Sequence, residues 1–349
     1  MKDLKQCRIE IDAIDQQLME LFEKRMALSK SVVEYKIENH LEIFQPERER
    51  EVIEKNLNRL NNDQLKEYAR CFIQEMMTVS KSYQSDLLPL ELDKNIKTDF
   101  KKDPVVGYQG IAGAFSQSAV ENFFGEGTKN IGYRDFEDVY VALENGEIDY
   151  GVLPIENSLT GSINDNYDLI RKYGFYIVGE TAVNVSQCLM ALPGTKIEDI
   201  RQVYSHPQGL AQSSEFLYQH RYIEQRPFQD TAMAAKYVMD SKDSTKAAIA
   251  SPLACKLYGL EMLKENVQNK KNNRTRFMVI SKELICPKES DKVSVIFTLP
   301  HQVGTLDNML QTIKQSQINM DRIESRPIET QYWQYYFYIE VVGDLSGAA

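Results

Sequence analysis

The sequence predicts a multidomain chain in which an all-α segment is followed by an α/β region and then by a short α+β unit. Apolar residues with helical spacing run through the first residues without interruption, which predicts helices there. Beyond about residue 100, short β-rich runs alternate with helical patterns, and a β-α-β-β pattern follows near the end. The 349 residues also exceed what one hydrophobic core usually organises, so we expect two or three domains.

The helical segment is predicted to span residues 1–90. Residues 3–36 form one long helix, because neither Pro nor Gly interrupts an apolar stripe made of Leu4, Cys7, Ile11, Ile14, Leu18, Leu21, Leu28, Val32 and Tyr35. Shorter helices are expected at about 46–60, with Pro46 in the first turn, and at 63–87, with Asp63 as the cap. Three helices of unequal length would leave the long stripe half bare, so we expect an intertwined homodimer or a higher oligomer.

A linker is predicted at residues 91–102, where the periodicity lapses into a mixture of lysine and aspartate. The α/β region follows at 103–286. Its strands are expected at short apolar runs that alternate with helices: Val105–Tyr108, Tyr150–Leu153, Phe175–Val178, Ala247–Ala250 and Phe277–Ile280. This alternation predicts largely parallel strand pairing.

The last part, residues 291–349, has the order of a ferredoxin-like unit. A strand at Val293–Leu299 precedes a turn at Gly304 and a helix at Leu306–Gln315, and strands are expected near Met320–Ser325 and Tyr335–Val342. The chain stops at Ala349, before the final helix and strand of that pattern, so an incomplete sheet with an exposed edge is expected.

Composition and charge exclude several classes of function. The 41 Lys and Arg against 51 Asp and Glu give a net charge of -10, which disfavours nucleic acid or an anionic membrane as a partner. No signal region or span of about 18 apolar residues is visible, so a cytoplasmic protein is expected. The five cysteines and four histidines are scattered without a metal-binding spacing, so we expect reduced thiols and no metal.

Polar residues interrupt the apolar rows of the predicted helices. Arg25 stands between Leu21 and Leu28, and a buried guanidinium needs an anionic partner, which is either an internal carboxylate such as Glu49 or a ligand. Lys36 lies eleven residues further on and returns to nearly the same face. In the third helix, Ser80 and Gln84 continue an inward row.

These groups, with Arg48 beside Glu49, predict a bundle interior that binds and orients an anion without covalent chemistry.

Residues 1 to about 90 resemble the all-helical chorismate mutase family, whose pattern is matched by Arg8, Arg25, Lys36, Arg48, Glu49, Ser80 and Gln84. The resemblance implies that Arg25, and Arg8 of the partner subunit, hold the two carboxylates of chorismate. Lys36 and Gln84 would donate hydrogen bonds to the ether oxygen, Glu49 would accept from the ring hydroxyl, and Ser80 would assist at a carboxylate. Gln45 stands where the family often has Asp, which implies an altered contact with a hydroxyl.

Several helices of the α/β region are predicted to begin with an anion-binding arrangement. A glycine turn from Gly110 leads to Ser116 in a helix, and capping residues follow extended runs at Ser205, at Asp230-Thr231 and at Ser251. Most such caps are structural. Several facing one cleft would form a cradle of backbone N–H groups for a small dianion.

Residues 103–285 resemble prephenate dehydratase, on the motifs Pro154-Ile155-Glu156-Asn157-Ser158, Ser205-His206-Pro207-Gln208 and Thr275-Arg276-Phe277. The resemblance implies two α/β lobes similar to those of periplasmic binding proteins, with the site in the cleft. Thr275 would assist the leaving hydroxyl and Arg276 would bind a carboxylate. Glu156 is a weaker candidate for a proton source. The remaining candidates for substrate binding are polar residues at strand and helix ends: Asn157, Ser158, Asn164, Ser116, Ser205 and Thr231.

The last part resembles the amino-acid-binding ACT domain, on Gly304-Thr305-Leu306 and on Glu324-Ser325-Arg326-Pro327. The family uses these segments to bind phenylalanine at a dimer interface.

The predicted function is therefore a bifunctional enzyme of phenylalanine biosynthesis that turns chorismate into prephenate and prephenate into phenylpyruvate, without a cofactor. Two alternatives stay open. One is an active dehydratase with an inactive or dimerising mutase-like segment, on account of Gln45. The other is a cytoplasmic sensor of an amino acid or another solute.

Overall fold

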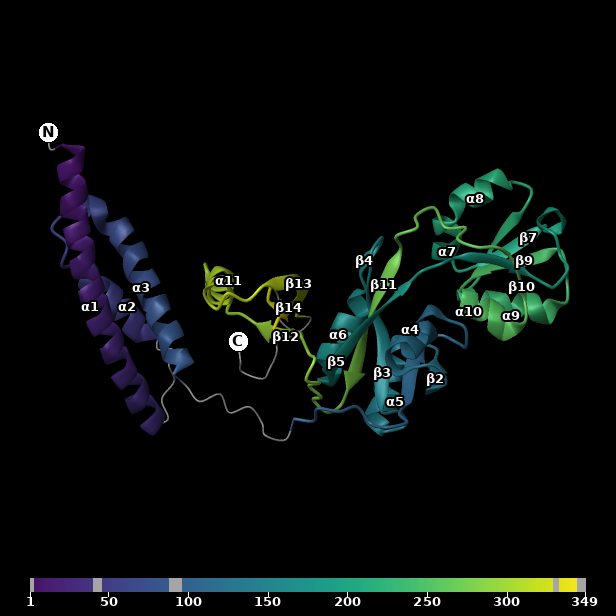
Figure 1. The fold of residues 1–349 in the computed structure, drawn as a ribbon, viewed down its shortest axis with the longest axis horizontal. Helices are drawn as coiled ribbons and strands as arrows, with labels where there is room; N and C mark the ends of the chain where they lie inside the picture. Colours follow the sequence, from purple (N-terminus) through teal and green to yellow (C-terminus); the bar gives the residue numbers. More distant parts are fainter. Residues whose placement is uncertain (1–2, 40–45, 88–95, 329–332, 344–349) are drawn as a thin grey trace. The chain divides into compact units, whose positions relative to one another are not determined.

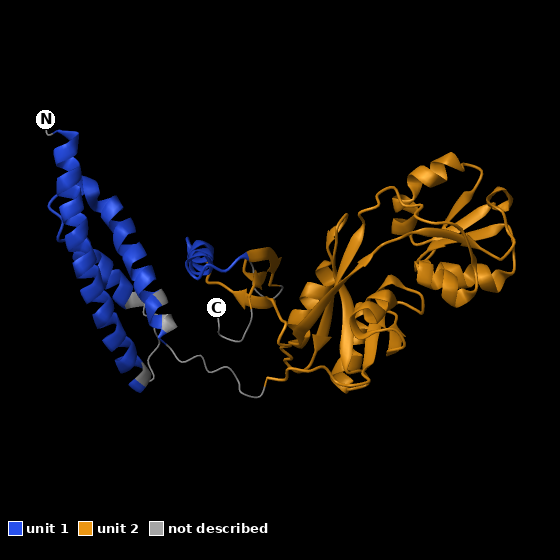
Figure 2. Cartoon of the chain, in the orientation of Figure 1, with its two compact units in different colours: residues 1–94, 302–319 blue, residues 95–301, 320–349 orange. Residues whose placement is uncertain are grey.

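The structure, a computed structural model, describes residues 3–39, 46–87, 96–328 and 333–343. The chain divides into two compact units (Figure 2). The first unit contains residues 1–94 and 302–319, and the second contains residues 95–301 and 320–349.

The first unit is helical. Its elements are α1 (Leu4–Glu38), α2 (Pro46–Leu57), a short 3-10 turn (Asp63–Leu65), α3 (Lys66–Asp86) and the later helix α11 (Thr305–Gln315). The long first helix is confirmed. The predicted cap is wrong by one residue, because the side chain of Asn62, not that of Asp63, accepts from the backbone N–H of Gln64 at 3.0 Å.

The apolar stripe of α1 is exposed, with Leu21 at 61% and Leu28 at 69% of their full accessibility. The side of α1 that its own unit covers carries Ser29 and Val33, which are buried, with Arg25 and Lys36 half-buried beside them. By helical spacing Arg25 shares the face of the stripe, but it stands at a place along α1 that is partly covered. A single chain leaves the stripe bare, as expected.

The second unit begins with a lobe built on a mixed sheet in the order β2-β1-β3-β11-β5 (Figure 1). Its strands are β1 (Val105–Gln109), β2 (Lys129–Tyr133), β3 (Tyr150–Asn157), β5 (Tyr176–Asn184) and β11 (Arg274–Ser281), with β4 (Gly161–Ser162) on β3. The helices of this lobe are α4 (Phe115–Phe124), α5 (Phe136–Asn145) and α6 (Asn164–Tyr173).

The second lobe has its own mixed sheet, in the order β10-β6-β9-β7-β8. Its strands are β6 (Cys188–Ala191), β7 (Gln202–Ser205), β8 (Glu224–Pro227), β9 (Lys246–Ala250) and β10 (Glu261–Lys264). Its helices are α7 (Pro207–Gln212), α8 (Ser214–Gln219), α9 (Thr231–Ser241) and α10 (Pro252–Tyr258), and a 3-10 turn (Ile197–Asp199) precedes β7.

The prediction of largely parallel pairing is wrong for both sheets. β1 runs parallel to β2 and β3, but β11 runs antiparallel to β3 and β5. In the second lobe, β7 is parallel to β8 and β9, whereas β6 is antiparallel to β9 and β10. In the first sheet the reason is the path of the chain. Strand β5 leads from this sheet to the second lobe, and β11 returns from that lobe, so β11 runs antiparallel to β5 and to β3 on its other side.

Strand β11 separates two hydrophobic clusters. Phe277 and Val279 pack in one cluster, which continues into the second lobe, while Met278 and Ile280 pack in the other, beside α5 and α6. This is the alternation of side chains expected of a strand.

The C-terminal strands form an antiparallel sheet in the order β12-β14-β13. Their bounds are β12 (Lys292–Thr298), β13 (Met320–Pro327) and β14 (Tyr335–Val342). The predicted β-α-β-β order is confirmed, since α11 lies between β12 and β13 in the chain.

The two lobes meet where the loop before α4 contacts α10. Ser251 Oγ donates to the carbonyl oxygen of Gly113 at 2.6 Å, and the hydroxyl of Tyr258 donates to that of Ala112 at 2.6 Å. A Cβ at Gly113 would lie 2.8 Å from the Cα of Ala254, which is closer than packed carbon atoms approach. Gly113 also has a φ of +91°, so both its freedom and its small size are needed.

We therefore expect Gly113→Ala to lower the free energy of unfolding more than a matched control, Gly127→Ala. Gly127 has a φ of +81°, but a Cβ there would meet open space. Both changes should cost about 1–2 kcal/mol for the positive φ, and Gly113→Ala about 1–3 kcal/mol more for overpacking. Denaturant unfolding of the two variants measures this, and equal losses would contradict the close contact between the lobes.

Candidate active sites

A buried polar layer lies between α1 and α3 in the first unit. The hydroxyl oxygens of Ser29 and Ser80 are 2.7 Å apart, and Gln84 Nε2 donates to Ser80 Oγ at 3.4 Å. Gln84 is 8% exposed, and its Oε1 has no hydrogen-bond partner among the described residues. A buried amide oxygen in this state is expected to take a donor from elsewhere.

Two cations of α1 stand beside this layer. Arg25 Nη1 donates to the carbonyl oxygen of Met76 at 3.5 Å, and burial lowers the pKa of Arg25. Burial also lowers the pKa of Lys36, although the carboxylate of Glu49 offsets part of that shift. Glu49 itself forms an ion pair with Lys81 at 2.9 Å. Of the two partners considered for Arg25, the internal carboxylate of Glu49 is paired with Lys81, and Arg25 contacts a backbone carbonyl.

The other mutase-like candidates lie apart from the layer. Arg48 is exposed and pairs with Glu51 at 2.9 Å, so within one chain it does not join the interior group. Arg8 is exposed on α1. Gln45 lies outside the described residues. Sequence reasoning missed Ser29, although it stands four residues after Arg25 on the same helix face.

A second buried polar cluster joins the carboxyl end of β3 to the start of β11. Asn157 Nδ2 donates to Asn273 Oδ1 at 2.8 Å and to Thr275 Oγ1 at 2.9 Å, while Asn157 Oδ1 accepts from the backbone N–H of Leu159 at 3.0 Å. Because Thr275 Oγ1 accepts this bond, its own hydrogen is directed away from Asn157. The Thr275 hydroxyl is thus positioned as a donor.

Neighbouring residues brace this cluster. Ser158 Oγ donates to the carbonyl oxygen of Asn272 at 3.1 Å and accepts from the N–H of Arg274 at 3.0 Å. Asn273 is 1% exposed, and its Nδ2 has no partner among the described residues. Sequence reasoning missed Asn273, whose signal was its place two residues before Thr275.

Arg276 lies on the opposite face of β11 from Thr275, which corrects its expected place at the same substrate site. Its guanidinium contacts Glu156 at 3.0 Å, Glu340 at 2.8 Å and Glu180 at 3.1 Å. Burial lowers the pKa of Arg276, but hydrogen bonds to Glu180 and Glu340 outweigh burial and raise it.

Glu156 is held in the same group of ion pairs. Its Oε2 accepts from Arg276 and also from Arg322 at 2.7 Å. Its carboxylate is therefore committed to guanidinium groups on the face away from Thr275, and the expected role as a proton source is not supported by its position.

The predicted anion cradle is occupied by the protein's own groups. The carboxylate of Asp230 accepts from Ala232 N at 2.7 Å and from Met233 N at 3.0 Å at the start of α9. Ser205 is fully buried, and its Oγ donates to the carbonyl oxygen of Ile249 at 2.6 Å. The Asp230 cap is structural. The cap of α7 is His206, whose Nδ1 accepts from Gln208 N at 3.2 Å, and Ser205 has no exposed surface for a substrate.

The remaining candidates are placed as follows. Thr231, in the first turn of α9, is half-buried against Gly209, and Ser116 is buried in the first turn of α4. Asn164 is exposed at the start of α6, whose buried residues pack in the cluster on the Arg276 face of the sheet.

The expected effector residues of β13 contact the first lobe. Glu324 Oε2 accepts from Ser162 Oγ at 3.0 Å, and Arg326 Nη2 donates to Asp168 Oδ2 at 2.6 Å. Ser325 and Pro327, at alternate positions of the strand, are exposed. Gly304, with a φ of +86°, precedes α11, where Thr305 Oγ1 donates to the carbonyl oxygen of Gln302 at 3.1 Å and Leu306 is half-buried.

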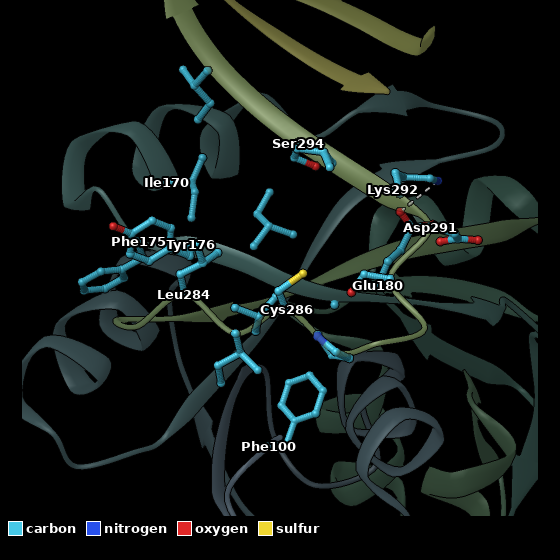
Figure 3. Close-up of a pocket in the computed structure, with 18 of the residues that line it drawn as sticks. Phe100, Ile170, Phe175, Tyr176, Glu180, Leu284, Cys286, Asp291, Lys292 and Ser294 are labelled. Atoms are coloured by element: carbon cyan, nitrogen blue, oxygen red, sulfur yellow. Dashed lines mark ion pairs between the residues drawn. The ribbon is translucent and has the colours of Figure 1, made fainter. Parts of the chain in front are cut away.

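A groove of about 890 Å³ lies beside β5 in the second unit (Figure 3). Phe175 and Leu284 lie in it with Cys286, and Lys292 pairs with Glu180 at 3.5 Å. None of the predicted site residues is among its lining residues.

Among the helices that the structure describes, none combines the length and the apolar character that a membrane crossing requires. The described His, Cys, Asp and Glu side chains form no group that could hold a metal ion.

Two family models match separate parts of the chain: residues 7–85 match chorismate mutase type II, and residues 106–285 match prephenate dehydratase. The bifunctional chorismate mutase/prephenate dehydratase of Aquifex aeolicus is 34% identical over 345 residues, which cover 98% of this chain and 91% of that protein. The chain belongs to the bifunctional chorismate mutase/prephenate dehydratase family. It therefore joins an isomerase domain and a lyase domain in one polypeptide.

Two solved structures that are similar to this chain each cover 68% of it. One is described as GqqA, a novel type of quorum quenching acylase, with 30% identity, 87% of that chain covered and a TM-score of 0.63. Another is the prephenate dehydratase of Arthrobacter aurescens in complex with L-Phe, with 27% identity, 80% of that chain covered and a TM-score of 0.62.

Proposed function

We propose that this enzyme catalyses two consecutive steps of phenylalanine biosynthesis at two separate sites. The first site rearranges chorismate to prephenate. The second converts prephenate to phenylpyruvate with loss of carbon dioxide and water. The observation that carries the proposal is that each matched domain holds its own buried polar cluster, around Ser80 and Gln84 in one and around Asn157 and Thr275 in the other.

At the first site, the rearrangement breaks the C–O bond of the ether and forms a C–C bond within one molecule, so no acid, base or nucleophile is required. Catalysis then consists of holding a compact conformer and stabilising negative charge on the ether oxygen. Arg25 binds one carboxylate of chorismate, and Arg8 of the partner subunit binds the other. Lys36 and Gln84 face the ether oxygen as donors, and Glu49 accepts from the ring hydroxyl.

Gln84 donates to the ether oxygen through Nε2, which also contacts Ser80 Oγ. Rotation of the amide group would exchange the places of Nε2 and Oε1. Gln84 Oε1 has no hydrogen-bond partner among the described residues, which supports the binding of a further donor group at this amide. Ser80 is shared between Ser29 and Gln84 and so orients that amide.

At the second site, the bond between the ring and its carboxylate breaks, and the electron pair closes the aromatic ring as the hydroxyl departs. The departing oxygen needs a hydrogen-bond donor. Thr275 supplies it, since Asn157 fixes the hydroxyl oxygen and leaves the hydrogen free to turn toward a substrate. A threonine is a weak acid, so its contribution is a positioned hydrogen bond and not a full proton transfer.

The C-terminal strands are proposed to form an ACT-like effector domain that binds phenylalanine. The support is the strand order β12-β14-β13, which is that of the first strands of a ferredoxin-like unit, and the L-Phe in the related Arthrobacter aurescens structure. Contacts of Glu324 and Arg326 with the first lobe give such an effector a route to the enzyme.

The two-site assignment predicts a double dissociation. Arg25→Ala should lower chorismate turnover by about 100-fold or more and leave prephenate turnover unchanged, because the group that holds one carboxylate of the compact conformer is lost. Thr275→Ala should do the reverse, while Thr275→Ser, which keeps the hydroxyl, should retain most of the activity. The measurement follows prephenate and phenylpyruvate separately, with and without phenylalanine. Loss of both activities in either folded variant would refute two separate sites, and a wild type that makes phenylpyruvate only from added prephenate would indicate an inactive mutase domain.

The lowered pKa of Lys36 predicts that mutase activity falls as the pH rises. Lys36 can donate to the ether oxygen with its full charge only while protonated, so kcat/KM should drop with an apparent pKa below the ordinary lysine value of about 10.4. The remaining mutase activity of Lys36→Arg should persist to higher pH than that of the wild type, because the guanidinium group stays protonated. Prephenate turnover over the same pH range is the control, and a parallel decline of both activities would contradict the assignment.

The bare stripe of α1 predicts a homodimer through the helical unit. Ile14→Asp should convert the dimer to a monomer and reduce mutase activity by more than about tenfold, because Arg8 must come from the partner subunit. Ala27→Asp adds the same charge on another side of the helix, at an exposed position, and should leave both properties unchanged. Light scattering measures the mass, and a monomeric wild type would be inconsistent with the proposed dimer.

A further inference from the structure

An ion-pair cluster links the C-terminal sheet to the strands that carry the dehydratase residues. It consists of Glu156 on β3, Glu180 on β5, Arg276 on β11, Arg322 on β13 and Glu340 on β14. Arg276 contacts Glu156, Glu180 and Glu340, and Arg322 Nη1 reaches Glu156 at 2.7 Å. Arg322 also donates to Ser162 on β4 at 2.6 Å.

The most buried members come from the C-terminal sheet. The side chain of Glu340 is 3% exposed and that of Arg322 is 11% exposed. Charged groups this far from solvent interact strongly, and removing one partner leaves another charge uncompensated. The cluster is therefore a stiff connection, unlike the exposed ion pairs of the surface.

The cluster lies directly behind the residues proposed to act on prephenate. Arg276 follows Thr275 in β11, and Glu156 precedes Asn157 in β3. The two strands pair with Thr275 opposite Asn157 and Arg276 opposite Glu156. Consecutive side chains leave a strand on opposite faces, so the ion pairs hold from one face the same backbone that presents the hydroxyl and the amide on the other.

We propose that Arg322 and Glu340 are positioning residues for the dehydratase reaction. They act through Glu156 and Arg276, which set the separation of β3 and β11 and with it the 2.9 Å contact between Asn157 Nδ2 and Thr275 Oγ1. The inference rests on the proposed role of Thr275. It assigns to the C-terminal sheet a direct part in the geometry of the uninhibited site.

A neighbouring contact provides a matched control. Asp168 on α6 accepts from Arg326 at 2.6 Å and from the hydroxyl of Tyr336, so it also attaches the C-terminal sheet to the first lobe. It reaches α6 and not β3 or β11. A purely structural role for the interface predicts equal effects at Arg322 and Asp168, whereas positioning predicts an effect at Arg322.

The experiment compares Arg322→Ala, Arg322→Lys, Glu340→Gln and Asp168→Ala in the full chain, without phenylalanine. The thermal unfolding of each variant, followed by circular dichroism, checks that its second unit is folded. We expect Arg322→Ala and Glu340→Gln to lower kcat for prephenate by about tenfold or more, with a smaller change in KM, because a displacement near 1 Å costs about that much or more. Arg322→Lys should recover part of the loss, and Asp168→Ala should change kcat by less than about twofold.

A double variant tests the route through Thr275. If Arg322 acts by placing that hydroxyl, Arg322→Ala should cause little further loss in a Thr275→Ala background. Multiplicative losses, or equal effects of Arg322→Ala and Asp168→Ala, would overturn the inference. If Arg322→Ala does not fold, Glu340→Gln carries the same comparison. A wild type without prephenate turnover, or a fully active Thr275→Ala variant, would instead refute the proposed function on which the inference stands.

Discussion

The pleat of β11 sends consecutive side chains to opposite faces of its sheet, and the organisation of the larger unit depends on that alternation. Thr275 meets Asn157 on one face, and Arg276 meets Glu340 on the other. Both edges of β11 are paired, with β3 and with β5, so the strand cannot slip by one residue without exchanging the two faces. The same constraint divides the hydrophobic core and separates the residues proposed to act on prephenate from those that attach the C-terminal sheet.

The helical unit buries polar side chains between α1 and α3. Ser29, Ser80 and Gln84 share hydrogen bonds, so most of their polar atoms are satisfied without water. Arg25 relies on a backbone carbonyl instead of a carboxylate. Among the described residues Arg25 has no carboxylate partner, so in the proposed site its charge is available to an incoming anion, in a protein with a net charge of -10.

The elements were predictable where local pattern decides them. The long helix, five of the strands of the α/β region (β1, β3, β5, β9 and β11) and the β-α-β-β order follow from periodicity and from turn residues. The direction of the strands was not predictable from the sequence. The residues of β11 do not indicate that the chain returns to the first sheet from another lobe. Arg276 was expected at the same site as Thr275 because the two residues are adjacent in one motif. Consecutive residues of a strand point to opposite faces of the sheet, so adjacency in a motif does not place both side chains at one site. The inward carboxylate of Glu340, in an otherwise apolar strand, was a signal for its cationic partner.

The exposed stripe of α1 has a consequence for how the two halves of the chain respond to dilution. A helical unit that buries its stripe against a second copy gains part of its folding free energy from association, so its stability falls as protein concentration falls. The lobes, whose clusters close within one chain, have no such dependence. In the proposed dimer, a cell that makes little of this protein would therefore lose the first reaction of the pair before the second.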